Sequence, residues 1–513
     1  MLKGIKAREY QENIYETCKN NNCLVVIPTG LGKTLIALQL AIERLRFYPK
    51  SKILFLAPTR PLVEQHYNYF KKYSEFENTH IFTGKINAAK RKEIWKDAQI
   101  IFSTPQCIQN DLKRFRIDLK EVSLLIEDEC HRCLKNYSYT FVAKKYKEQA
   151  KHSRILGLTA SPASDPKKIK EICNNLEIEA VEIRTRQSED VKPYLQELTQ
   201  EIIKVDFPEE LNNIRILLKN IYDKKVKELQ NRKLLFKRPT KTHLIELQGN
   251  LIKTLSKGNK NFNVLKGMSV CAQAIKIQHA LELLETQTLE TLNLYMKELY
   301  EQARKGKSKA VKNLTTNKNF QDAYLLVMKL HGENFEHPKL IKLKEILEKQ
   351  FRENFKVLIF SQYRDTVAKI NSELTSAGFK SNIFIGQSSR RMDGLTQKEQ
   401  QLILHKFKQG EINFMISTSI GEEGLDIPEV DLVVFYEPIP SAIRKIQRAG
   451  RTARLKPGKL TILMAKGTRD EAYYWAAFHK ERKMHENLQN LQDELNKKPK
   501  NTKEKDQKDF SDF

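Results

Sequence analysis

The segment between two apolar runs near the start of the chain has the residue types that bind phosphate. It reads Ile27-Pro28-Thr29-Gly30-Leu31-Gly32-Lys33-Thr34. Gly30 and Gly32 would let the backbone approach an anion, Lys33 would add a positive charge, and the Thr34 hydroxyl could hold Mg²⁺. An apolar run precedes this segment and a helix-like segment follows it, so successive N–H groups and a helix dipole would face the anion. We therefore expect a nucleoside triphosphate site that also includes Thr29.

A second apolar run, residues 122–127, leads into the acidic pair Asp128 and Glu129. Hydrolysis of a triphosphate needs a carboxylate for the metal and a base that positions water. Asp128 could reach Mg²⁺, and Glu129 could orient and deprotonate the attacking water. An acidic pair after a strand is by itself more often a solvated loop, but the phosphate loop upstream favours a hydrolytic site.

Apolar runs alternate with helix-like segments along two parts of the chain, which predicts parallel sheets covered by helices. Between them, leucines and isoleucines recur at helical spacing among many lysines, for example in the segments from Leu211 to Glu228 and from Ala274 to Tyr300. The expected fold is α/β, with two parallel-sheet domains and an all-helical insertion between them. The expected boundaries are 1–204, 205–338 and 339–490, followed by a disordered basic tail, 491–513.

The charge of the chain favours a polyanionic partner. The 513 residues include 90 Lys and Arg against 63 Asp and Glu, a net charge of +27, so nucleic acid is the leading partner and an anionic membrane surface comes second. The basic clusters 224–241 and 304–312 favour a nucleic-acid face on the insert over a merely solvated one. No apolar stretch reaches the roughly 20 residues of a transmembrane helix, and the start of the chain lacks a signal-peptide core.

The seven cysteines, an odd number, fit a reducing compartment. We expect a soluble, cytoplasmic protein with no membrane partner. Cys130 and Cys133 form a CxxC pair, but no second CxxC completes a zinc site.

Further motifs follow the two triphosphate motifs in a fixed order and carry a family resemblance. The ordered set is Arg8-Glu9-Tyr10-Gln11, Ala57-Pro58-Thr59-Arg60, Ser103-Thr104-Pro105-Gln106, Thr159-Ala160-Ser161-Pro162, Ile359-Phe360-Ser361-Gln362, Gly421-Glu422-Glu423-Gly424-Leu425-Asp426, and Gln447-Arg448-Ala449-Gly450-Arg451-Thr452-Ala453-Arg454. This set resembles the superfamily 2 helicases over 1–205 and 340–490. The long insert and the segment 467–475 are similar to the Hef/FANCM/Mph1 group, which remodels branched DNA. The resemblance implies two RecA-like motor domains with ATP and Mg²⁺ as cofactors.

The resemblance also implies roles for single residues. Arg451 and Arg454 lie three apart, on one side of a helical turn, and look like arginine fingers for the γ-phosphate. The remaining nucleotide contacts by resemblance are Arg8, Gln11, Gln447, Gly424 and Asp426. The implied nucleic-acid contacts are Arg60, Thr104, Gln362 and Thr418, although a turn or cap role is as good an explanation for any one of them.

Two motif positions depart from the family pattern. Cys130 replaces the commoner residue of a DEAH box, and Ala453 stands where many relatives have glycine. Both side chains are small, so we expect no loss of chemistry, though alanine disfavours a backbone with positive φ. Archaeal Hef often carries an XPF-like nuclease domain, which we do not expect in this chain.

The expected function is an ATP-dependent DNA helicase or translocase that acts on forked or branched DNA in replication-fork repair, associated with the nucleoid. One alternative is an RNA-stimulated ATPase similar to the RIG-I and Dicer helicases, which also carry a helical insert. Another is a non-catalytic scaffold that holds nucleic acid, against which the charged residues of both triphosphate motifs argue. A separate nuclease is a further candidate partner.

The end of the chain resembles a peptide that docks on DNA sliding clamps, Q-x-x-h-x-x-a-a. Gln507 would occupy a polar pocket, while Phe510 and Phe513 would project to the same side of a 3₁₀ turn and fill an apolar pocket. The alternative is a frayed terminus with two exposed phenylalanines.

Overall fold

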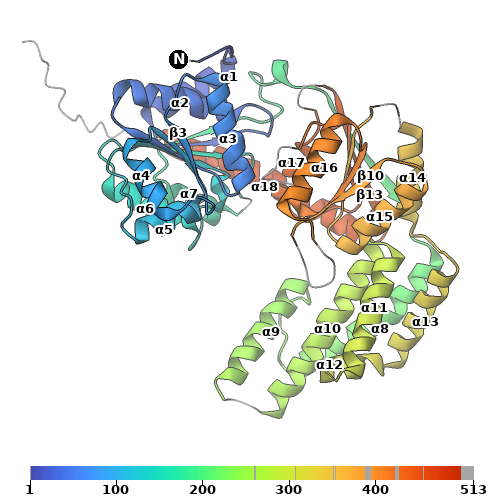
Figure 1. Ribbon diagram of the computed structural model, residues 1–513. Coiled ribbons are helices and arrows are strands. Elements are labelled where there is room, and N and C mark those ends of the chain that lie inside the picture. Colours follow the sequence, from blue (N-terminus) through green and yellow to red (C-terminus); the bar gives the residue numbers. More distant parts are fainter. Residues whose placement is uncertain are drawn as a thin grey trace, which may run out of the picture.

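In the computed structural model, residues 2–163, 165–258, 261–306, 308–350, 352, 354–387, 394–421, 427–453 and 456–497 are described. They form two sheet domains, here called motor 1 and motor 2, and a helical insert that extends from motor 2 (Figure 1). Within the described residues no helix is both long and apolar enough to span a lipid bilayer.

Motor 1 is a seven-stranded, all-parallel sheet in the order β3-β4-β2-β5-β6-β1-β7. Its central strands are short apolar runs buried on both faces, as a sheet covered on both sides by helices requires. The strands are β1 (Cys23–Val26), β2 (Lys52–Leu56), β3 (Thr79–Phe82), β4 (Ile100–Ser103), β5 (Val122–Asp128), β6 (Ile155–Thr159) and β7 (Ala180–Ile183). The helices are α1 (Glu9–Asn20), α2 (Lys33–Phe47), α3 (Arg60–Tyr73), α4 (Ala88–Asp97), α5 (Pro105–Lys113), α6 (Ser138–Gln149) and α7 (Pro166–Asn175).

Motor 2 is a six-stranded parallel sheet in the order β10-β11-β9-β12-β13-β8. Its strands are β8 (Leu198–Val205), β9 (Val357–Phe360), β10 (Ser381–Phe384), β11 (Phe414–Ser417), β12 (Leu432–Phe435) and β13 (Gly458–Ala465). Its helices are α14 (Pro338–Gln350), α15 (Arg364–Ser376), α16 (Gln397–Gln409), α17 (Ala442–Ala449) and α18 (Arg469–Lys497). Single 3₁₀ turns occur at Cys130–Arg132, Lys192–Tyr194 and Ser419–Gly421.

The insert is all-helical, as the leucine and isoleucine spacing predicts. Its helices are α8 (Glu209–Asn231), α9 (Lys241–Ser256), α10 (Phe262–Thr286), α11 (Leu289–Arg304), α12 (Lys309–Thr315) and α13 (Lys318–Gly332). The segment from Ala274 to Tyr300 differs from the expectation, because it is two helices and not one. Gln287 is extended (φ −119°, ψ −168°), and the Thr288 side chain accepts a hydrogen bond from the Thr291 N–H, which starts α11 as an N-cap.

Two domain boundaries also differ from the sequence expectation. All but the last residue of strand β8 falls within the range 1–204 expected for motor 1, but β8 pairs along its whole length with β13, so it is the edge of the motor 2 sheet. Helix α18 begins in motor 2 and continues through Lys497, past residue 491, where a disordered tail was expected. Its residues Met484, Leu488 and Leu491 pack in the core of motor 1. Burial of these apolar residues against motor 1 explains why the helix continues.

Candidate ATP and nucleic-acid sites

The phosphate loop takes a backbone conformation that requires glycine at two positions. Gly30 and Gly32 have φ of 86° and 74°. A Cβ atom on Gly32 would also lie 2.4 Å from Nε2 of Gln11. The Gln11 amide donates to the Leu31 carbonyl oxygen (3.1 Å) and accepts the Arg8 N–H (2.9 Å), while the Arg8 guanidinium lies over the Tyr194 ring. Helix α1 is thereby joined to the loop that would hold phosphates.

Thr34, in the first turn of α2, and Asp128, at the end of β5, are the expected metal ligands, and they meet around one imidazole. Nε2 of His66 lies 2.8 Å from Oδ2 of Asp128, and Nδ1 of His66 lies 3.4 Å from Oγ1 of Thr34. Burial alone would raise the pKa of Asp128, but the charges of His66 and Lys33 and the His66 hydrogen bond outweigh it, and this pKa is lowered. The Lys33 ammonium donates to the Ile27 carbonyl oxygen at 3.0 Å.

Glu129 is held in an unusual backbone conformation directly after β5. Its φ is 51°, in the left-handed region, and its side chain is buried. A carboxylate oxygen lies 3.2 Å from Nδ1 of His131, and the same nitrogen lies 3.1 Å from Oγ1 of Thr159. The segments that follow β5 and β6 are therefore connected beside the expected base.

Motor 2 contacts the phosphate loop through the segment after α17. Oγ1 of Thr29 donates to the Gly450 carbonyl oxygen at 3.4 Å, and a Cβ atom on Gly450 would lie 1.7 Å from that hydroxyl. Gln447 and Arg451 flank Gly450 and are both buried. A cavity of about 650 Å³ lies beside this contact, lined by residues of both motors. The arrangement brings the expected arginine finger Arg451 to the motor that carries the phosphate loop.

The four expected nucleic-acid residues follow neighbouring strands. Arg60 and Thr104 follow β2 and β4, which pair with each other, while Gln362 and Thr418 follow the paired strands β9 and β11. In motor 1 the phosphate-side residues follow β1 and β5 instead. Ligands bind at the carboxyl ends of parallel strands, and in motor 1 the expected nucleic-acid and phosphate residues follow different strands of one sheet.

Local contacts leave these side chains available in different degrees. Nε of Arg60 pairs with the Glu64 carboxylate at 2.8 Å. Thr104 occupies the N-cap of α5, yet its side chain makes no capping hydrogen bond. The Gln362 N–H donates to Oε1 of Glu437 (2.6 Å), which fixes the backbone of Gln362 while its side chain stays half-buried.

The residues around His66 fit a divalent cation of the kind that accompanies triphosphates. Mg²⁺ prefers hard oxygen ligands, and the Thr34 hydroxyl and the Asp128 carboxylate supply two of them, 3.4 and 2.8 Å from the same imidazole. The lowered pKa of Asp128 keeps its carboxylate ionised, as a metal ligand must be.

Three family matches cover most of the chain in the order of the domains. Residues 8–169 match the DEAD/DEAH box helicase family, residues 210–334 match an RNA-helicase helical bundle, and residues 338–456 match the helicase conserved C-terminal domain. The crystal structure of the Pyrococcus furiosus Hef helicase domain is 45% identical and superposes with a TM-score of 0.71, covering 92% of this chain and 98% of that one. The chain belongs to the Hef/FANCM/Mph1 group of helicases.

The chain spans only part of the length of the curated relatives that it matches. A Methanocaldococcus jannaschii protein, whose name proposes an ATP-dependent RNA helicase, is 42% identical, with 96% of this chain and 62% of that protein covered. The Fanconi anemia group M protein homolog of Mus musculus and the ATP-dependent DNA helicase mph1 of Sclerotinia sclerotiorum are each 32% identical. Those matches cover 92% and 94% of this chain but 25% and 41% of the relatives. As a member of this family, the helicase binds and hydrolyses ATP.

Sequence reasoning missed residues that hold others in place. His66 lies on the buried face of α3, where it stacks on Phe55 with ring centroids 4.4 Å apart. In the sequence, His66 is a single polar residue on the apolar face of an expected helix. This pattern is also typical of a histidine with a purely structural role. Gly424, Asp426 and Arg454 lie outside the described residues, as do Gln507, Phe510 and Phe513.

Ala453 has φ of 56°, in the region that alanine disfavours. The alanine that replaces the family glycine therefore adopts the positive φ that favours glycine.

Proposed function

We propose that this helicase acts on DNA and separates strands or moves branch points at forks, in replication-fork repair. The observation that carries the proposal is a basic helical insert, fixed to motor 2, in a chain whose relatives include proteins named as DNA helicases. A strongly basic protein binds the DNA backbone without reading its sequence, which suits an enzyme that acts on forks of any sequence. Through its DNA partner the protein would associate with the nucleoid.

In the proposed mechanism the phosphate loop and Lys33 bind the triphosphate, while Gln11 and Arg8 contact the base. Thr34 and Asp128 would hold Mg²⁺, which supplies charge neutralisation at the phosphates. Glu129 orients the attacking water and takes its proton.

Motor 2 completes this site when the two motors close. Arg451 and Arg454 neutralise charge on the γ-phosphate, Gln447 helps to order the water, and Gly424 with Asp426 closes on the nucleotide. The hydrogen bond of 3.4 Å from Thr29 to Gly450 supports this proposal, because it joins the phosphate loop to the segment that carries Arg451. Closure would couple hydrolysis to movement along the strand.

Arg60 and Thr104 on motor 1, with Gln362 and Thr418 on motor 2, would grip the nucleic-acid backbone. Their positions at adjacent strand ends in each sheet support one continuous track beside the ATP site. Phosphate contacts of this kind fix the register of the strand without reading its sequence.

The tip of the insert supplies the preference for branched DNA in this proposal. Lys227 and Lys233 are exposed at the far end of α8, and Arg238 is exposed on the segment that returns from there toward the start of α9. Phe236 and Phe262 are 85% and 76% exposed, and exposed rings beside cations suit base stacking at an unpaired junction. Replacing these three cations with alanine should weaken binding to a fork more than binding to linear duplex. The control is Lys144→Ala/Lys167→Ala/Lys168→Ala, which removes the same charge from motor 1. An equal loss of affinity for the fork and for linear duplex would show that the tip supplies only general electrostatic attraction.

Deleting the whole of 205–338 is a poorer test, because the insert supplies buried hydrogen-bond partners to motor 2. We still expect basal ATPase activity to survive without the insert tip, since the phosphate loop lies in motor 1.

An RNA-stimulated ATPase is the second candidate, since one relative and one matched family are named for RNA. The deciding experiment is a titration of ATPase rate against single-stranded DNA, linear duplex, fork, four-way junction and duplex RNA at one stated salt concentration. The DNA proposal predicts that the fork or the four-way junction stimulates at the lowest concentration. Stronger stimulation by duplex RNA would favour the second candidate, and no hydrolysis at all would favour a scaffold.

We also propose a sliding clamp as a partner, through Gln507, Phe510 and Phe513, and a nuclease supplied by another chain. The support for the clamp is the spacing of these residues behind a lysine-rich segment that could act as a tether. Calorimetric titration of the cognate clamp should give binding heat with the full chain and none with Phe510→Ala/Phe513→Ala. Indistinguishable heats would remove the clamp from the list of partners.

A further inference from the structure

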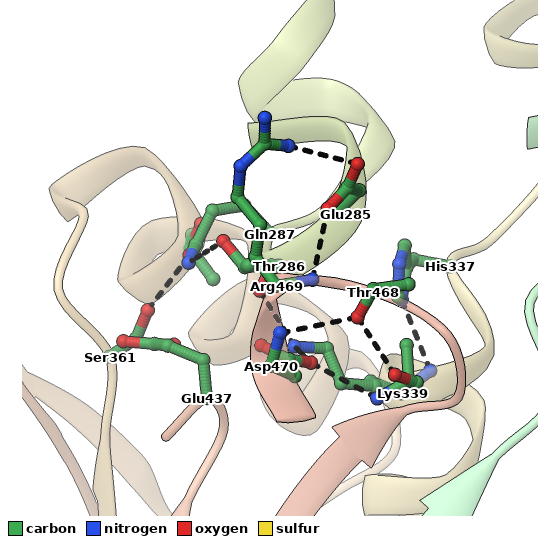
Figure 2. A network of polar contacts seen from close by, with 12 residues as sticks. Glu285, Thr286, Gln287, His337, Lys339, Ser361, Glu437, Thr468, Arg469 and Asp470 are labelled. Carbon is green, nitrogen blue, oxygen red and sulfur yellow. Dashed lines mark hydrogen bonds and ion pairs between the residues drawn. The ribbon is translucent and has the colours of Figure 1, made fainter. Parts of the chain in front are cut away.

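The break between α10 and α11 brings a residue of the insert against a motif loop of motor 2. Gln287 stands at this break, is fully buried, and lies beside the segment 361–366, here called the loop, which joins β9 to the first turn of α15 (Figure 2). This loop contains Gln362. Had the segment continued as one helix, Gln287 could not have extended toward the sheet.

The Gln287 side chain holds both ends of that loop. Its Oε1 accepts hydrogen bonds from Oγ of Ser361 (3.2 Å) and from Oγ1 of Thr366 (2.8 Å). Its Nε2 donates to Oγ1 of Thr286 (2.9 Å), which fixes the orientation of the amide. Oγ1 of Thr366 is also 2.9 Å from Oγ1 of Thr291, the first turn of α11. Two hydroxyls of the loop are thus bound to the insert, with Gln362 between them.

Motor 2 holds the middle of the loop from the other side. Oε1 of Glu437, which follows β12, accepts the Gln362 N–H at 2.6 Å. Glu437 is fully buried. Three hydrogen bonds from two domains therefore hold the segment around Gln362, whose own side chain stays half-buried.

The insert end that carries Gln287 is itself immobilised. Nζ of Lys339 donates to the Thr286 carbonyl oxygen (2.8 Å) and to Oδ2 of Asp470 (2.7 Å), and both charged side chains are fully buried. The Glu285 carboxylate accepts from the Arg469 N–H (2.9 Å) and pairs with its guanidinium (2.9 Å). Figure 2 shows these contacts converging on the end of α10. Moving this helix end would strip partners from buried charges, which is costly.

We propose that Gln287 and Glu437 are positioning residues that set the nucleic-acid contact of Gln362, so that the insert forms part of the motor 2 nucleic-acid site. This inference rests on the contact proposed above for Gln362. Helix α10 has 25 residues, about 37 Å in length, and runs from the basic tip of the insert to this loop. A branch bound at the tip and a strand bound at motor 2 would thus share one rigid element.

The test compares two glutamines of the same helical domain. Gln287→Met removes the acceptor at nearly constant volume, and Gln273→Met makes the same change at a buried glutamine whose amide donates only within α10, to Ser269. The readout is the concentration of forked DNA that gives half-maximal ATPase stimulation, with the KM for ATP and the unfolding midpoint measured in parallel. Gln287→Met should raise that concentration by about tenfold, because a displaced contact loop loses alignment. Gln273→Met should leave the half-maximal concentration of forked DNA within twofold of that of the parent, even if this substitution changes the unfolding midpoint.

Three further variants separate positioning from folding. Glu437→Gln keeps the acceptor for the Gln362 N–H, so its half-maximal concentration of forked DNA should equal that of the parent. Glu437→Met removes the acceptor and should raise this concentration. Ser361→Ala should cause a smaller rise, and its effect should not add to that of Gln287→Met. A half-maximal concentration for Gln287→Met within twofold of the parent would overturn the inference while leaving the proposed function intact. If no nucleic acid stimulates the ATPase activity of the parent, both the inference and the proposed function are wrong.

Discussion

Motor 1 and motor 2 place their functional loops at the same edge of similar sheets but secure them in different ways. In motor 1, His66 joins Thr34 to Asp128, and all three residues belong to that domain. In motor 2, the loop around Gln362 depends on Gln287 of the insert. The comparison teaches that the proposed phosphate site is held by residues of motor 1 alone, whereas the proposed nucleic-acid loop of motor 2 is held by two domains.

The strongest way to separate the two halves is to disable motor 1 alone. Lys33→Ala should lower ATP turnover by two to three orders of magnitude or more, roughly the effect of removing one preorganised charge from such a site. The affinity for nucleic acid should stay within a few-fold of that of the parent, because the proposed nucleic-acid contacts follow β2, β4, β9 and β11, whereas Lys33 follows β1. Lys50→Ala, an exposed lysine beyond the other end of α2, is the control for charge. Turnover by Lys33→Ala near that of the parent would contradict the assignment of the phosphate loop.

The next largest effect should come from cutting the connection between the insert and motor 2. Lys339→Met leaves Asp470 buried without its ammonium partner, which should lower the free energy of unfolding of motor 2 by about 3–5 kcal/mol. Hydrogen exchange should show faster opening of α10 and α14 with little change in α2. Lys342→Met, which removes an exposed ion pair from the same helix, should leave these rates unchanged. Equal destabilisation of α2 would show that the two motors do not unfold separately.

The pH dependence of motor 2 stability should reflect the carboxyl that holds the Gln362 backbone. Burial raises the pKa of Glu437 to about 7, although Arg448 partly opposes the shift. A carboxyl whose pKa is raised by folding stabilises fully below its unfolded pKa, and this stabilisation is lost as pH rises through the folded pKa. Glu437→Gln should therefore match the parent near pH 4 and exceed it by up to about 3 kcal/mol near pH 8.5. If the difference in the free energy of unfolding between Glu437→Gln and the parent does not change with pH, Glu437 is not the group that causes the pH dependence.

The smallest effect concerns a single backbone conformation in motor 2. Ala453→Gly should raise the free energy of unfolding of this domain by about 0.5–1 kcal/mol, because glycine has no Cβ penalty at φ of 56°. Ala368→Gly, in the interior of α15, should have the opposite sign and a similar size. If both variants destabilise, the positive φ at residue 453 carries no strain.

Sequence reasoning was most successful where chemistry and element spacing coincide. The phosphate loop and the acidic pair each follow a buried apolar run, so strand, turn and helix could be placed around Lys33 and Asp128. The family motifs, in order, predicted two parallel-sheet domains around a helical insert.

What could not be predicted depends on partners distant in the sequence. β8 leaves motor 1 because it pairs with β13, more than 250 residues later. Gln287 interrupts an otherwise helical pattern because its amide binds a loop some 75 residues away. His66 is distinguished from a structural histidine only by its distance of 2.8 Å to Asp128. These are tertiary contacts, and no local periodicity encodes them.

The most direct test of this helicase as an ATP-driven DNA-remodelling enzyme is strand separation on a forked DNA by the parent and by Glu129→Gln. Both proteins should bind the fork and ATP with similar affinity, because Glu129 acts on the attacking water and not on binding. The parent should separate the strands or move the branch point only when ATP and Mg²⁺ are present, and Glu129→Gln should do neither. Remodelling by Glu129→Gln at the rate of the parent, or a parent that hydrolyses ATP on the fork without changing it, would contradict the proposed function.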